Sequence, residues 1–137
     1  MRRITRRGFV GGMLGVLALA AAPVRAVARV RIGASASPSE KVARFFTNDA
    51  GAVRIGSVYL QAHPDEGDAE TLFDALTPPG ERPQQWWTSV SMGELRRTIR
   101  AAAHADFKSG DVVDLEGWQL ARTEARLAAL LKATGGG

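Results

Sequence analysis

The chain has 137 residues, with 18 lysine and arginine residues, 14 aspartate and glutamate residues and no cysteine. This length suits one domain with a single modest core. The lack of cysteine excludes a disulfide scaffold, thiolate metal sites and iron–sulfur clusters.

The first 28 residues have the three parts of an export signal. The start is rich in arginine, and no charged residue interrupts positions 8 to 24. Ala26-Val27-Ala28 is a small-x-small site with cleavage before Arg29, and cleavage two residues earlier is the alternative. The segment therefore predicts an N-terminal signal peptide over residues 1–28.

Within this segment, the order Thr5-Arg6-Arg7-Gly8-Phe9 resembles the twin-arginine signal, in which serine or threonine precedes the arginine pair. The resemblance implies that the twin-arginine (Tat) translocase recognises Arg6, Arg7 and Phe9. It also implies a periplasmic or otherwise extracytoplasmic location after export in the folded state. The uncharged run reaches only the lower limit of about 17 residues for a spanning helix. We therefore expect membrane contact only during export, with an uncleaved membrane anchor as the alternative.

Removal of the signal changes the charge balance. It takes away five arginines and no acidic residue, and leaves 109 residues with 13 basic and 14 acidic side chains. The resulting net charge near −1 offers no basis for a nucleic-acid partner.

The remaining chain is predicted to form a flexible leader over residues 29–38 and a single, mainly helical domain over residues 39–134. Apolar residues three and four positions apart predict four to five helices, over residues 39–46, 49–62, 68–76, 91–108 and 122–132. Asp49, Asp68 and Ser91 are the expected N-terminal caps of three of them. Glu116-Gly117, between strand-like segments, predicts one short β-hairpin at 112–120, before the C-terminal helix.

Residues 77–85 contain three prolines and a glycine, which predicts a long loop. Trp86 and Trp87 follow it, and we expect one ring to fill the core while the other covers the loop. Trp118 is expected to hold the hairpin against the helices. Because tryptophan is frequent at interface centres, Trp86, Trp87 and Trp118 are also the candidate partner contacts.

The helix predicted over residues 91–108 has an apolar stripe that includes Phe107 and an arginine cluster beside it. Arg96, Arg97 and Arg100 lie off the stripe. A solvated basic face is the favoured interpretation of this cluster, and an anion site is the alternative.

Motifs for nucleotide binding, serine hydrolysis, zinc proteolysis and haem attachment do not occur in the sequence. No cofactor, metal site or catalytic residue is therefore assigned. His63 stands near Asp65, and His104 stands two residues before Asp106. These side chains would form a metal or acid–base site only if the two regions met, and surface positions are the favoured interpretation.

The chain is loosely similar to the small subunits of periplasmic flavin-dependent dehydrogenases for sugars and sugar acids, in its size, its signal and its lack of cofactor motifs. This resemblance implies a non-catalytic accessory subunit whose partner is a larger exported enzyme. The first alternative is a free-standing periplasmic domain that binds a ligand. The second is a small hydrolase that uses His63 or His104.

Overall fold

The computed structural model describes residues 35–135. The predicted signal peptide, with Arg6, Arg7, Phe9 and both cleavage sites, lies outside the described residues, as does the leader up to residue 34. Export and recognition by the translocase therefore stay predictions.

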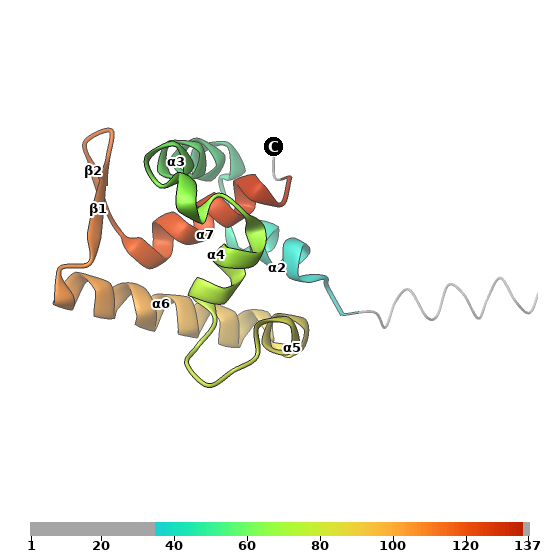
Figure 1. Cartoon of the computed structure of the whole chain (residues 1–137). Helices are drawn as coiled ribbons and strands as arrows, with labels where there is room; N and C mark the ends of the chain where they lie inside the picture. Colours follow the sequence, from blue (N-terminus) through green and yellow to red (C-terminus); the bar gives the residue numbers. More distant parts are fainter. Residues whose placement is uncertain (1–34, 136–137) are drawn as a thin grey trace, which may run out of the picture. The chain divides into compact units, whose positions relative to one another are not determined.

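The described residues form six α-helices, one 3₁₀ turn and one β-hairpin (Figure 1). In chain order they are α2 (Pro38–Phe45), α3 (Asp49–Ala62), η1 (Pro64–Glu66), α4 (Ala69–Leu76), α5 (Pro83–Ser89), α6 (Met92–Ser109), β1 (Val112–Leu115), β2 (Trp118–Ala121) and α7 (Arg122–Ala133). The predicted mainly helical fold, with one hairpin directly before the C-terminal helix, is confirmed.

Among the α-helices of the described residues, α5 is the one that the sequence pattern did not predict. It begins at Pro83, inside the segment expected to be a loop. Proline breaks the interior of a helix, but it fits the first turn because the backbone N–H that it lacks has no partner there. Trp86 and Trp87 are consequently helical residues.

Polar side chains begin several of the other helices. The Asp68 carboxylate accepts a hydrogen bond from the backbone N–H of Thr71 at 2.8 Å, and the Ser91 hydroxyl accepts one from Glu94 at 3.1 Å. Both predicted caps are therefore confirmed. At α3 the cap is Asn48 and not Asp49.

Helix α7 forms the centre of the fold and contacts α2, α3, α4 and α6. In Figure 1 it runs between α3 and α6. Its apolar side chains are buried almost all the way round, which is typical of a helix enclosed by others. Gly56 lets α3 approach closely, because a Cβ atom there would lie 2.2 Å from the backbone oxygen of Ala128.

The hairpin turns at Glu116 and Gly117, whose φ angles of 53° and 84° suit a tight two-residue turn between antiparallel strands. Val113 and Leu115 on β1 are buried. Trp118, opposite Leu115, is 71% exposed, so the prediction that it holds the hairpin against the helices is wrong. Because Leu115 is buried and its partner Trp118 is not, β1 and not β2 packs against the core at this end of the hairpin.

Phe107 is 50% exposed, so its predicted place on the buried stripe of α6 is also wrong. The buried residues of α6 are Leu95, Ile99 and Ala103, each four positions after the last. Four residues exceed one turn of about 3.6, so each such step moves around the helix, and a further step takes Phe107 off the buried side; Asp106, three positions after Ala103, stays near it. The Asp106 carboxylate accepts a hydrogen bond from the backbone N–H of Thr123 at 2.7 Å.

Candidate functional site

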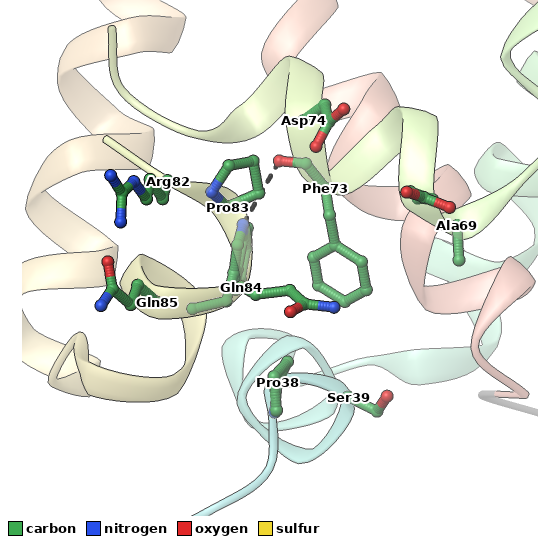
Figure 2. A pocket seen from close by; sticks show the side chains of 11 residues that line it. Pro38, Ser39, Ala69, Phe73, Asp74, Arg82, Pro83, Gln84 and Gln85 are labelled. Atoms are coloured by element: carbon green, nitrogen blue, oxygen red, sulfur yellow. Dashed lines mark hydrogen bonds between the residues drawn. The ribbon is translucent and has the colours of Figure 1, made fainter. Parts of the chain in front are cut away.

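A groove of about 800 Å³, called here the first groove, lies between α2, α4 and α5 (Figure 2). Its lining combines aromatic, proline, amide and charged side chains: Pro38, Ser39, Ala69, Glu70, Phe73, Asp74, Arg82, Pro83, Gln84, Gln85 and Trp87. In Figure 2 the ring of Phe73 points into the groove and lies beside the side-chain amide of Gln84. An aromatic ring beside amides and carboxylates can bind a small polar ligand through stacking and hydrogen bonds.

Trp86 and Trp87, two of the candidate partner contacts, lie on α5 and are 7% and 1% exposed. The indole nitrogen of Trp87 donates to the carbonyl oxygen of Phe73 at 3.3 Å and to the hydroxyl of Thr77 at 3.1 Å. Both rings therefore belong to the core. Of the three tryptophans in the sequence, Trp118 is the one with a large area open to a partner.

The first groove is held together by a buried lysine. Lys41 on α2 is 4% exposed, and its ammonium donates to the carbonyl oxygens of Trp87 and Thr88 at 2.8 Å each. These carbonyls lie near the C-terminal end of α5, where a positive charge is favourable. No sequence pattern indicated this contact, because the two accepting residues lie 46 and 47 positions after Lys41 in the sequence.

A second groove, of about 580 Å³, lies among the connection between α2 and α3, the first half of α3, α6, β2 and α7. Its lining is largely apolar with two arginines: Phe45, Phe46, Thr47, Asn48, Gly51, Ala52, Ile55, Arg96, Ile99, Arg100, Ala103, Leu120, Glu124, Leu127 and Ala128. Trp118 shares a hairpin face with Leu120, two residues further along β2. The hairpin thus contributes both a groove wall and an exposed aromatic residue.

Arg96 is held in a fixed position at this second groove. Its guanidinium donates to the backbone oxygens of Phe45 and Arg44, at 3.4 and 3.0 Å. The Cζ atom also lies 5.4 Å from the centre of the Phe45 ring, a cation–π distance. Arg100 lines the same groove one helical turn later, whereas Arg97 does not line it.

A polar network joins α3, η1 and α7 away from both grooves. Arg126 donates two hydrogen bonds to the Glu66 carboxylate, at 2.9 and 2.7 Å, and Tyr59 donates its hydroxyl to the same carboxylate at 2.7 Å. Hydrogen bonds from Arg126 lower the pKa of Glu66 to about 2. The pKa of Tyr59 is raised, mainly by burial and to a smaller extent by the hydrogen bond to Glu66. The network fixes η1 onto α7, and every group in it has its partner.

His63 and His104 occupy separate environments. His63 ends α3, with its ring 4.4 Å from that of Tyr59, whereas His104 is exposed on α6. Within residues 35–135, no group of three or more His, Asp or Glu side chains is arranged to hold a metal ion.

Comparison with protein-family models, with curated proteins and with solved structures finds no match for this chain. In the part that the structure describes, no helix has both the length and the apolar character needed to cross a membrane. The two grooves and the exposed Trp118 are therefore the features on which a functional proposal is built.

Proposed function

We propose that this chain is a small exported, non-catalytic subunit that binds a larger extracytoplasmic enzyme. The observation that carries the proposal is the exposure of Trp118 on an ordered hairpin. Covering a ring of this size would contribute roughly 3 kcal/mol to association. Tryptophan is also the residue type most enriched among those that dominate binding energy at interfaces.

The surroundings of Trp118 suit this role. Val113 and Leu115 are buried and pack the hairpin against the core. Glu116 at the turn forms a 2.9 Å ion pair with Arg54 on α3. An aromatic side chain on a supported element loses little conformational entropy when a partner covers it. The export signal supports the location, because the Tat route carries folded proteins and would deliver this domain together with its partner.

Affinity purification from the envelope of cells that natively produce the chain tests the proposal. We expect one larger protein to co-purify in stoichiometric amount. Trp118→Ala should weaken this association by about tenfold or more, as expected for a central interface residue. Gln119→Ala is the matched control, because Gln119 is the next residue, is exposed and faces the other side of the hairpin. Isolation of the wild-type chain as a monomer without a companion refutes the proposal.

Export is tested separately by replacing Arg6 and Arg7 together with lysine. The translocase reads the guanidinium pair and not charge alone, so we expect an uncleaved precursor to accumulate in the cytoplasm. Normal export of the double-lysine variant would show that the route is a different one.

The first groove favours a second candidate function, a free-standing domain that binds a small ligand. Its volume and its mixture of aromatic, amide and acidic groups are typical of such sites. A ligand that binds there would raise the melting temperature of the purified chain. Gln84→Ala should remove that rise, while Thr88→Ala, on the same helix but outside the lining, should keep it.

A further inference from the structure

The lining of the second groove is apolar on the side of the core. Ile99 and Leu127 are buried, whereas Ile55 and Leu120 remain partly exposed across the opening. Partly exposed apolar side chains from two different elements form a surface that an apolar partner can cover. The groove is open to solvent, so a structural element of a partner can reach this apolar surface from outside.

The edge of this groove on α6 carries positive charge. Arg96 and Arg100 are four residues apart and therefore lie one above the other on the helix, with Arg97 adjacent. Like charges at this spacing repel each other and destabilise a helix. None of the three arginines has a carboxylate within 4.0 Å among residues 35–135, where the ion pairs involve Arg54, Arg122 and Arg126. No carboxylate of the described domain therefore pairs with these three positive charges.

The acidic residue in the lining is already engaged. Glu124 accepts a hydrogen bond from the backbone N–H of Ala121 at 3.2 Å, which supports the start of α7. Arg96 is fixed by Phe45 and Arg44, while the Arg100 side chain makes no hydrogen bond to another residue of the described domain. The groove therefore presents one fixed and one adaptable guanidinium beside an apolar surface.

We propose that the second groove binds an amphipathic α-helix of the partner protein, with acidic side chains on one edge of its apolar face. Apolar side chains of that helix would lie against Ile55 and Leu120. Two carboxylates three or four residues apart on that helix would reach Arg96 and Arg100. The Cβ atoms of residues at this spacing are about 5–6 Å apart on any helix, so the two carboxylates and the two arginines are similarly spaced. This inference rests on the proposed function and assigns the chemistry of the partner segment.

The test uses the full chain in the cells that natively produce it. The variant Arg100→Glu reverses the charge beside the groove. The control Arg97→Glu makes the same change at an exposed position of the same helix that does not line the groove. We expect Arg100→Glu to weaken the affinity for the co-purified partner at least about tenfold more than Arg97→Glu does. Equal melting temperatures of the two variants establish that both are folded.

A photo-crosslinking amino acid identifies the segment in the groove. p-Benzoylphenylalanine in place of Thr47, an exposed residue of the lining, should crosslink to the partner, whereas the same group in place of Thr88 should not crosslink to that segment. We expect the crosslinked peptide to have apolar residues at helical spacing and two acidic residues three or four positions apart.

Any other result contradicts either the inference about the groove or the proposed accessory function. Equal weakening by the two charge reversals, or a crosslinked segment without acidic residues, overturns the inference while the accessory function stands. A crosslink to a second copy of this chain, or a small acid retained in the groove by native mass spectrometry, also overturns it. Absence of any co-purifying protein overturns the accessory function itself.

Discussion

Replacing Gly56 by alanine tests the close contact between α3 and α7, on which the core depends. A Cβ atom at position 56 would lie 2.2 Å from the carbonyl oxygen of Ala128 and 3.0 Å from the Cα atom of Ala129. Both are backbone atoms of a buried helix, so no side-chain rotation relieves the overlap. The two helices must separate by roughly 1 Å before these atoms reach ordinary contact distance.

The expected loss of stability follows from two opposing effects. Overpacking a tight core typically costs 1–3 kcal/mol, and an overlap with the main chain belongs at the upper end, about 3 kcal/mol. Alanine is a better helix former than glycine by about 1 kcal/mol. We therefore expect the free energy of unfolding to fall by about 2 kcal/mol, which lowers the melting temperature of a domain of this size by about 10 °C.

The assay is urea and thermal unfolding of the purified chain, with Gly93→Ala as the matched control. Gly93 lies in the first turn of α6, and the nearest atom to an added Cβ is the terminal Nη1 of Arg97 at 3.7 Å. This control should keep or raise stability, by up to about 1 kcal/mol. If Gly56→Ala is as stable as the wild type, α3 and α7 do not approach as closely as described.

Four further substitutions test other parts of the structure. Trp118→Ala should cost less than about 1 kcal/mol of stability because its ring is exposed, whereas Trp87→Ala should cost about 3–5 kcal/mol; equal losses in denaturant unfolding would contradict the assigned burial. Arg126 holds the pKa of Glu66 at about 2, below its ordinary value of 4.5. The ionised carboxylate therefore contributes stability that is fully present above pH 4.5 and is lost as the pH falls towards 2. The stability difference between the wild type and Glu66→Gln should shrink over that interval, and a constant difference would refute the pairing. Lys41→Met should cost about 1–3 kcal/mol, because one buried and one partly buried carbonyl lose their donor; full stability of this variant would show that they are otherwise satisfied.

Local sequence signals were sufficient for most helices and for the hairpin. The turn at Glu116-Gly117 was predictable because a tight two-residue turn needs positive φ angles, which glycine adopts without strain. Asp68 and Ser91 were predictable as caps, because a short polar side chain before a periodic apolar run can satisfy the free N–H groups of the first turn. These features depend on residues within a few positions of one another.

The candidate sites depend on contacts between residues far apart in the sequence, which local patterns do not predict. The arginine cluster on α6 was visible in the sequence, but whether it borders solvent alone or an apolar groove is decided by Phe45 and Leu120, which come from distant parts of the chain. Lys41 contacts α5 across more than 40 residues, and Glu66 meets Arg126 across 60. In each case the sequence supplies the charged group and tertiary packing supplies its partner.

The tryptophans show the same division most clearly. The sequence by itself determined that the chain has three large aromatic rings whose apolar area favours burial. The tertiary structure alone decided which ring took which place. Pro83 starts a helix that turns Trp86 and Trp87 into the core, and the hairpin packs Leu115 of β1 into the core while Trp118, opposite it on β2, stays exposed. Burial is a property of the whole packed chain, so residue type and local spacing do not determine it.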